Sequence, residues 1–430
     1  MNRILVRMYA TLSALVIAAP AVAQVSSPFD SRTYERGDLK ITVGPTRMIM
    51  RGPMFPWPMM FDDGSIIVIA SAVEEGKGAA YVRSTDRGET WRPFVPPKAG
   101  YCIPNVQFPD GTAAMHGSPM PTPIPDRPNY YTVARYETKD RGMTSTLTHG
   151  TLYVPPEVCS PKLHHQFHGN MIYTKRGELL SVMQGMEEEP APNVPKGYKN
   201  PFKCFLVKST DKGHTWTYVS HVASLRDVSG PTADAMNAGW HTWGACESAL
   251  VEVADGKLVC AMRTLDDNHK PLIGEASDTY RDLFSTVRGS DIYPGSLRLP
   301  ADKYFTLSPP TTPLLICYSD DHGETWTKPV AMREALGNMP QMAFDGKILA
   351  LSAGALNYPR WGNGITFSLD GGKTWTELIN YAPFFTSGYG GLLSIEPGRF
   401  LAIFDYAAPQ PWKEHAAHWV GAMDIKVERR

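Results

Sequence analysis

Three histidines stand close together between residues 163 and 170: His164, His165 and His168. An imidazole titrates near neutral pH, so a histidine can donate or accept a proton during catalysis or bind a polar substrate. Histidines also bind zinc, but this spacing lacks any supporting metal-binding motif. A solvated loop histidine is the structural alternative for each of the three. Their grouping makes substrate binding or proton transfer an equally good explanation.

Four copies of the pattern Ser-x-Asp-x-Gly-x-Thr-Trp recur along the chain, beginning at Ser84, Ser209, Ser319 and Ser368. In each copy the Asp carboxylate accepts hydrogen bonds from backbone N–H groups of a tight turn, and the Gly takes a positive-φ position that a side chain would disfavour. The Trp buries a large flat surface against neighbouring strands. Residues 137–144 match the pattern in part, and we interpret them as a degenerate fifth copy.

A second repeat consists of two apolar segments separated by a turn centred on Gly. The turns lie at residues 63–64, 110–111, 176–177, 255–256, 345–346 and 397–398. Such X-Gly pairs between segments of strand-like composition predict β-hairpins. The six hairpins imply six repeated units, of which the third and fourth carry insertions.

Through these Asp-boxes the chain resembles the sialidase-type β-propellers over nearly its whole length. The resemblance implies an all-β fold, a six-bladed β-propeller of four-stranded antiparallel blades closed radially, so that no long sheet edge is left open. We expect a single catalytic propeller domain over residues 24–430, with residues 39–43 completing the last blade. In this topology the Gly turns and Asp-boxes share the bottom face, whereas first strands start and second strands end at the top face.

Polar and aromatic residues that can take part in chemistry gather on the expected top face. They are Phe55, Trp57, Glu74, Glu75, Tyr101, Asn105, His116, His164, His165, His168, Gln184, Glu187, His241, Trp243, Glu247, Arg263, Gln341, Asn357, Arg360, Tyr389 and Asp405. Among them we expect His165 and His168 to act in catalysis. We expect Trp57, His164, His241 and Trp243 to bind the substrate. This convergence is the strongest functional signal in the sequence.

In sialidases a Tyr attacks the anomeric carbon, a Glu takes its proton, an Asp serves as acid/base and three Arg bind the substrate carboxylate. Residues 246–252 and 387–393 resemble the family's Glu and nucleophile segments. The resemblance implies Tyr389 as nucleophile, Glu247 as its base, and Arg263 and Arg360 as carboxylate ligands. A buried Tyr–Glu hydrogen bond without catalysis is the structural alternative.

Two departures separate this chain from the family pattern. Pro56 stands where the family has its first Arg, and Arg51 lies nearby but out of register. The Asp acid/base expected in the next loop is also missing, and Glu74 or Glu75 is the candidate replacement. With one Arg lost, the substrate either carries its carboxylate differently or has none.

We therefore interpret the chain as an exported, exo-acting glycoside hydrolase that cleaves a terminal anionic sugar such as sialic acid. A second interpretation is a propeller glycosidase or polysaccharide lyase that uses His and Tyr on uronate, rhamnose or arabinose units. A third is a propeller that binds carbohydrate without catalysis. In every case the partner is a carbohydrate, and we expect a monomer that needs no metal or other cofactor.

Composition and the N-terminal segment agree with this interpretation. Lys and Arg total 42 and Asp and Glu total 43, a net charge of −1 that gives no reason to expect nucleic acid or an anionic membrane as partner. Arg3 and Arg7, an apolar run and Ala21-Val22-Ala23 predict a signal peptide over residues 1–23 and a secreted or periplasmic protein. No other segment is apolar enough to span a membrane. Most of the six cysteines are expected to be isolated buried thiols.

Overall fold

The computed structural model describes residues 30–72, 79–94, 105–116, 120–159, 165–187, 202–228, 242–265, 313–357, 361–406 and 418–430. Over these residues the fold is all-β, with one 3-10 turn, η1 (Leu225–Asp227). The predicted signal peptide lies outside them. No helix in these ranges has the length and apolar character needed to cross a membrane.

Hydrogen-bonded antiparallel strands follow one another along the chain in sets, each named by its first strand. The β4 set contains β4 (Pro53–Met60), β5 (Ile66–Ala72), β6 (Ala80–Ser84) and β7 (Arg92–Pro93). The β8 set contains β8 (Asn105–Gln107), β9 (Ala113–His116), β11 (Tyr130–Thr138) and β12 (Thr146–Tyr153), and β10 (Thr122–Pro123) pairs with β11. The β13 set contains β13 (His165–Tyr173), β14 (Leu179–Met186), β15 (Phe202–Ser209) and β16 (Thr215–Ala223).

The remaining sets continue this pattern. The β17 set contains β17 (Thr242–Ala254), β18 (Lys257–Leu265), β19 (Pro313–Ser319) and β20 (Val330–Leu336). The β21 set contains β21 (Asn338–Phe344), β22 (Leu349–Asn357), β23 (Trp361–Ser368) and β24 (Ile379–Phe385). The β25 set contains β25 (Gly390–Glu396), β26 (Arg399–Tyr406) and β27 (Trp419–Arg429).

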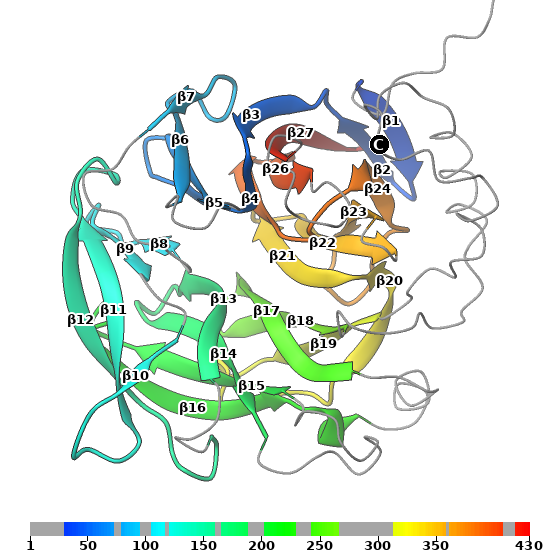
Figure 1. Cartoon of the computed structure of the whole chain (residues 1–430). Helices are drawn as coiled ribbons and strands as arrows, with labels where there is room; N and C mark the ends of the chain where they lie inside the picture. The colour runs from blue at the N-terminus through cyan, green and yellow to red at the C-terminus, as the bar shows by residue number, and fades with distance from the viewer. Residues whose placement is uncertain are drawn as a thin grey trace, which may run out of the picture.

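An N-terminal strand completes the β25 set. β2 (Leu39–Val43) pairs antiparallel with β27, and β1 (Arg32–Arg36) pairs with the outer side of β2. β3 (Arg47–Arg51) also pairs with β27. The first strands of the described residues and the C-terminal strand therefore lie in one sheet, beside the C-terminus in Figure 1. This confirms the prediction that residues 39–43 complete the last set.

Each predicted Gly turn connects the first two strands of a set, which pair antiparallel. The six turn glycines have positive φ between 69° and 96°. A residue with a Cβ is strained in this region, which explains the recurrence of Gly at these turns. The predicted hairpins are thereby confirmed.

Hydrophobic cores lie between neighbouring sets. Ile66 and Val68 of β5 pack into the core shared with the β25 set, whereas Ile67 of the same strand packs toward the β8 set. One strand serves two cores because successive side chains point to opposite faces of a sheet. Such cores join each set to the next, and the series returns from the β25 set to the β4 set.

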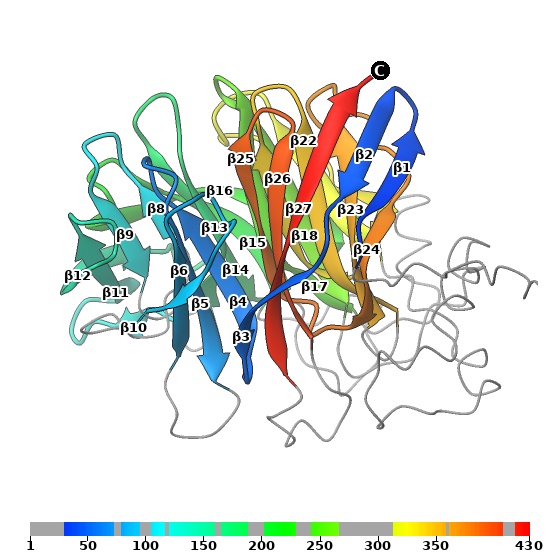
Figure 2. The same ribbon diagram turned by 90° about the horizontal axis from the view of Figure 1, so that it is seen from above.

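The sets are arranged around a common centre (Figure 1), with their strands standing side by side along one direction (Figure 2). First strands contact one another there: β13 with β17, β17 with β21, β21 with β25, and β25 with β4. The approach of β25 to β4 is close, since a Cβ on Gly391 would lie 2.0 Å from Cδ of Pro58. Only glycine fits at this contact.

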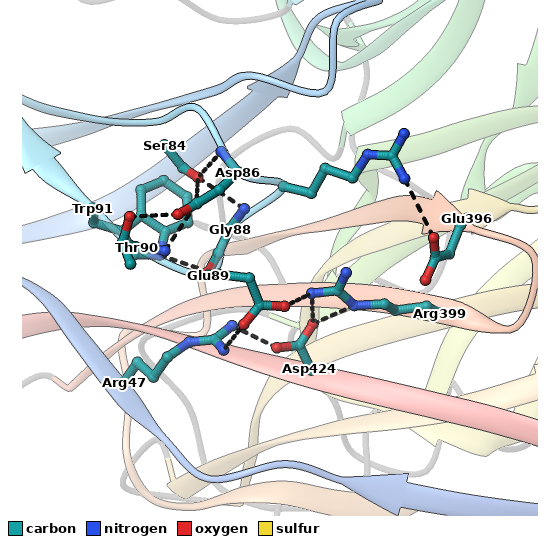
Figure 3. Close-up of polar contacts among 11 residues, drawn as sticks. Arg47, Ser84, Asp86, Gly88, Glu89, Thr90, Trp91, Glu396, Arg399 and Asp424 are labelled. Atoms are coloured by element: carbon teal, nitrogen blue, oxygen red, sulfur yellow. Dashed lines mark hydrogen bonds and ion pairs between the residues drawn. The ribbon is translucent and has the colours of Figure 1, made fainter.

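Every Asp-box forms the same local hydrogen bonds, as the first copy illustrates (Figure 3). Ser84 Oγ donates to Asp86 at 2.7 Å, the backbone N–H of Gly88 donates to Ser84 Oγ at 2.8 Å, and that of Thr90 donates to Asp86 at 2.9 Å. The degenerate copy forms the equivalent bonds, with Thr138 in place of Ser. Its interpretation as an Asp-box is confirmed.

In the first three boxes along the chain, counting the degenerate copy, the residue that precedes the box Gly reaches the Gly turn of the previous set. Arg87 pairs with Glu396 at 3.4 Å, Arg141 with Asp62 at 2.7 Å, and Lys212 with Asp110. These ion pairs put the Asp-boxes and the Gly turns at the same end of the strands, as predicted. The boxes therefore connect neighbouring sets as well as closing their own turns.

The seam between the β4 and β25 sets has a further ion-pair network (Figure 3). Glu89 of the first box pairs with Arg47 at 3.3 Å and with Arg399. Both arginines also pair with Asp424 of β27, at 2.6 Å and 2.8 Å. The network ties the N-terminal strand β3 to the last set of the chain.

Cys159, Cys204, Cys246, Cys260 and Cys317 are buried and free of disulfides. Burial raises the pKa of the Cys204 thiol well above its usual value, which keeps it protonated and unreactive. The prediction of buried thiols without disulfides is confirmed for these five, although Cys260 and Cys317 are hydrogen-bonded to each other and are not isolated. Cys102 lies outside the described residues.

Candidate active site

Tyr389 and Glu247 meet near the centre of the fold although they are 142 residues apart in sequence. Tyr389 directly precedes β25, and its Oη donates a hydrogen bond to Oε1 of Glu247 at 2.6 Å. Glu247 lies within β17 at φ 38°, where the pairing register shifts between Cys246 and Ser248. Such a β-bulge redirects a side chain out of the regular alternation, and positive φ is costly for a residue with a Cβ.

Arg263 and Gln184 hold Glu247 from other strands. Arg263 of β18 donates from Nη1 to Oε2 of Glu247 at 2.7 Å, and its side chain is 0% exposed. The amide oxygen of Gln184 in β14 accepts the backbone N–H of Glu247 at 2.7 Å. With Tyr389 on one carboxylate oxygen and Arg263 on the other, the Glu247 side chain is fixed in orientation.

Glu247 is ionised at neutral pH. Burial raises its pKa, but the charges of Arg263 and His168 and the hydrogen bonds from Arg263 and Tyr389 more than offset burial, so that the pKa lies below its usual value. An ionised carboxylate that already accepts the phenol hydrogen bond can receive the phenol proton.

Aromatic rings surround the Tyr389 phenol. The ring of Phe55 packs edge-on against it, with centroids 5.0 Å apart at 82°. Trp57 and His168 lie at centroid distances of 6.5 Å and 6.1 Å from the same ring. His168 Nε2 is also 3.8 Å from Oε1 of Glu247. His168 therefore lies close enough to interact electrostatically with Glu247.

Of the predicted site residues, the structure brings together Tyr389, Glu247, Arg263, His168 and Trp57. Trp243 belongs to β17, and its predicted role in substrate binding stays a prediction. Arg360, His164, His241, Glu74 and Glu75 lie outside the described residues. Their predicted roles stay predictions.

His165 lies apart from its neighbour His168. Its ring packs edge-on against Tyr131 of β11, with centroids 4.3 Å apart, and the residue is 6% exposed. The pairing register of β13 shifts between Phe167 and Met171, and His168 lies instead beside Tyr389 and near Glu247. Of the two histidines, the structure places His168 beside the Tyr389–Glu247 pair, and the catalytic role predicted for His165 stays a prediction.

Two positioning contacts were not anticipated from the sequence. Gln184 and Phe55 were expected on the top face without a role, but one binds the Glu247 backbone and the other packs on Tyr389. Gln184 stands in a strand that is buried almost throughout. A buried amide must be hydrogen-bonded, and this requirement was the signal that could have identified it.

One group of potential metal ligands lies elsewhere. Glu252, Asp255 and His322 bring ligand atoms within 4.8 Å of one another at the Gly-turn end of β17. Both oxygens of Glu252 already accept backbone N–H groups, from Lys175 at 3.0 Å and Gly256 at 3.2 Å. We therefore assign no metal role to this group.

A polar cavity of about 410 Å³ opens at the ends of β14, β15 and β16. It contains the ion pairs Arg226–Glu187 at 2.7 Å and His221–Asp227 at 2.6 Å. Glu187 follows Gln184 by three residues, so the cavity lies at the same end of β14 as the contact to Glu247.

Comparisons with known proteins agree with this architecture. Residues 318–328 match the BNR/Asp-box repeat family. No curated protein sequence matches the chain. A crystal structure of a protein of unknown function from Dyadobacter fermentans is similar at a TM-score of 0.57 and 17% identity, over 90% of this chain and 99% of that one.

Two sialidases are also similar in structure. A Hadza microbial sialidase matches at a TM-score of 0.54 and 16% identity, over 86% of this chain and 65% of that one. The NanB sialidase of Streptococcus pneumoniae matches at 0.53 and 12%, over 88% and 70%. Such low identities show a shared fold, and activity has to be argued from the site. The chain thus carries Asp-box repeats and has a sialidase-like fold.

Proposed function

We propose that this protein is a glycoside hydrolase of the sialidase type, in which Tyr389 is the nucleophile and Glu247 its base. The observation that carries the proposal is the 2.6 Å hydrogen bond from Tyr389 Oη to a buried carboxylate that Arg263 keeps ionised. A Tyr nucleophile suits an anionic sugar, because a neutral phenol approaches the anomeric carbon without the repulsion that a carboxylate would meet.

The proposed reaction has two steps. In the first, Glu247 takes the phenol proton, a bond forms between Tyr389 Oη and the anomeric carbon, and the bond from that carbon to the leaving oxygen breaks. An acid gives a proton to the leaving oxygen. Among the described residues the candidate for this acid is His168, whose Nε2 lies 3.8 Å from Oε1 of Glu247. In the second step, water attacks the anomeric carbon and gives a proton to the acid that lost one in the first step. The bond between Tyr389 Oη and that carbon breaks, and Tyr389 Oη takes its proton back from Glu247.

The charge of the sugar rests on the sialidase resemblance. Pro56 occupies the position of the family's first Arg, and Arg263 is buried in its ion pair with Glu247. A terminal anionic sugar such as sialic acid remains the proposed substrate. Arg263, which was also predicted to bind the carboxylate, pairs with Glu247, so Arg360 is the proposed carboxylate ligand. Because Pro56 replaces one of the family's carboxylate-binding arginines, the activity assay has to compare acidic sugars with neutral ones.

We also infer that the sets are the blades of a six-bladed β-propeller formed by residues 24–430. In support, hydrophobic cores join neighbouring sets in a series that returns to its start, and β2 completes the last set. The pattern of residues 1–23 supports export to the periplasm or the medium after their removal.

His168 supports a second candidate function. Its imidazole lies against Tyr389 and close to Glu247, an arrangement that also suits proton abstraction and return beside a substrate carboxylate. A polysaccharide lyase or glycosidase acting on uronate, rhamnose or arabinose units would use this pair. A lyase forms an unsaturated uronate, which absorbs in the ultraviolet, whereas a hydrolase does not.

The test is to assay the purified protein on fluorogenic sialosides and on a panel of acidic and neutral polysaccharides. Tyr389→Phe should lower kcat by about 10³-fold or more, because only the hydroxyl is lost. Tyr318→Phe is the matched control: it removes a hydroxyl that donates to the Gly372 carbonyl at 2.6 Å at the Asp-box end of the strands, and kcat should stay at the parent value. A parent-like kcat for Tyr389→Phe would exclude the Tyr mechanism.

A further inference from the structure

A buried carboxylate stands beside the Tyr389 turn. Asp405, at 0% exposure near the end of β26, accepts three hydrogen bonds from two distant segments. Its Oδ1 accepts the backbone N–H of Ser387 at 2.7 Å. Its Oδ2 accepts the Ser387 hydroxyl at 2.5 Å and the backbone N–H of Phe55 at 2.9 Å. One side chain therefore binds the turn before β25 and the start of β4 to each other.

Ser387 passes this restraint on to Tyr389. Its hydroxyl gives its hydrogen to Asp405, and its oxygen accepts the backbone N–H of Tyr389 at 3.1 Å. On the other side of the turn, Thr386 donates to Asn363 of β23 at 2.6 Å. The backbone from Thr386 to Tyr389 is thus fixed relative to two neighbouring strands.

The bond to Phe55 acts on the other side of the phenol. Phe55 has φ 56° at a register shift in β4, a conformation that a residue with a Cβ adopts only when its surroundings hold it. The ring of Phe55 packs edge-on against Tyr389. By accepting the Phe55 N–H, Asp405 holds the bulge that presents this ring.

We propose that Asp405 is a positioning residue that keeps the Tyr389 phenol aligned with Glu247, an inference that rests on the proposed role of Tyr389. It fixes both the backbone turn of Tyr389 and the ring packed on its phenol. A carboxylate is required, since each oxygen faces a backbone N–H. An amide in either orientation would turn its NH₂ group toward the N–H of Phe55 or of Ser387, and one of these donors would lose its acceptor.

The experiment compares Asp405→Asn with Asp424→Asn, the same substitution in the ion-pair network at the seam. Asp405→Asn should lower kcat by about 10- to 100-fold with little change in KM, because a small displacement of a reacting group costs a factor of this size. Asp424→Asn should keep the parent kcat. A parent-like kcat for Asp405→Asn overturns the proposal.

A double-mutant cycle separates positioning from general damage to the fold. If Asp405 acts through Tyr389, adding Asp405→Asn to Tyr389→Phe should cause no further loss of kcat. An equal fold-loss in both backgrounds overturns the proposal. Should Asp405→Asn fail to fold, Ser387→Ala decides: it removes the hydroxyl link to Tyr389, and a parent-like kcat in this variant overturns the proposal.

A crystal structure of Asp405→Asn gives a readout that does not depend on activity. The expected result is a Tyr389 Oη that has moved out of hydrogen-bond distance of Glu247. An unchanged Tyr389–Glu247 hydrogen bond overturns the positioning role. If Tyr389→Phe retains full activity while Tyr389 moves in Asp405→Asn, the proposed mechanism fails and the positioning of Tyr389 by Asp405 stands.

Discussion

The two ends of the strands are held by different kinds of contact. At the Gly-turn end, each Asp-box makes its hydrogen bonds between residues two to four positions apart, as from Ser84 to Asp86 and from Gly88 to Ser84. At the opposite end, Tyr389 binds Glu247 across 142 residues, and Glu247 binds Gln184 across 63. The boxes recur because each satisfies its own polar groups, whereas the site is formed once by residues from separate strands.

This difference predicts that substitutions at the two ends have separate consequences. Removing one charge of the Arg263–Glu247 ion pair leaves the other charge buried without its partner and alters proton transfer from Tyr389. Removing a box carboxylate affects one partly exposed turn, and the neighbouring boxes keep their own bonds. The predictions below test that separation.

The largest effect is expected for Arg263→Met. Glu247 would remain as a buried charge without its ion pair, and the free energy of unfolding should fall by about 3–5 kcal/mol. Because Arg263 lowers the Glu247 pKa, its removal raises that pKa, and the acidic limb of kcat/KM should move to higher pH. The pH profile and denaturant unfolding measure the two effects.

A matched double variant sharpens this prediction. Arg263→Met combined with Glu247→Gln removes both charges and should recover much of the lost stability, since no uncompensated buried charge remains. An acidic limb that stays in place in Arg263→Met would mean that Arg263 does not control the ionisation of Glu247.

An intermediate effect is expected for His168→Gln. If His168 is the acid that protonates the leaving group, kcat/KM should fall as rising pH deprotonates its imidazole, and the variant should lose that dependence. His149→Gln, at an exposed position of β12, is the control and should keep the parent profile. A parent-like profile for His168→Gln would move the acid role to Glu74 or Glu75.

The smallest effect is expected in an Asp-box. Asp211 accepts the backbone N–H and the hydroxyl of Thr215 at 2.8 Å and 2.6 Å, beside the buried Trp216. Asp211→Ala should lower the free energy of unfolding by about 1–2 kcal/mol, the usual cost of losing a capping side chain. The kcat should not change. A loss of kcat in a stably folded variant would show that the two ends are coupled.

The same boxes determine the response to acid. Burial raises the pKa of Asp86, but hydrogen bonds from Thr90 and Ser84 lower it to about 2, and similar bonds from Thr325 and Ser319 lower that of Asp321 to about 2. A carboxyl with a lowered folded-state pKa stabilises the fold above its unfolded pKa of about 3.9. That contribution should disappear as the pH falls from about 4 to 2, as unfolding measured across this range would show.

The local features were predictable because their physics is local. The Ser, Asp, Gly and Thr of a box lie within one turn, so the pattern specifies the hydrogen bonds, even in the copy where Thr138 replaces Ser. The Gly turns specify the hairpins in the same way. The grouping of Tyr389, Glu247 and Arg263 was predictable only through resemblance to sialidases, because nothing in the local sequence of one residue refers to the others.

Other parts of the site could not be predicted. His165 and His168 look equivalent in the sequence, but His165 packs against Tyr131 and His168 lies beside Tyr389 and Glu247. The bulge at Glu247 is a register shift between β17 and β18 that no pattern in residues 246–252 announces. Asp405 appears in the sequence only as an acid at the end of an apolar strand, and its partners at Ser387 and Phe55 lie 18 and 350 residues away.

The sequence by itself determined the repeated scaffold: the Asp-boxes, the Gly turns, the alternating apolar strands and the N-terminal strand that completes the last set. These features depend on backbone conformation and on hydrogen bonds between near neighbours. Only the tertiary structure decided which polar side chains of different strands come within hydrogen-bond distance at the centre. That outcome depends on the registers and bulges of separate strands, which are fixed when the sets pack against one another.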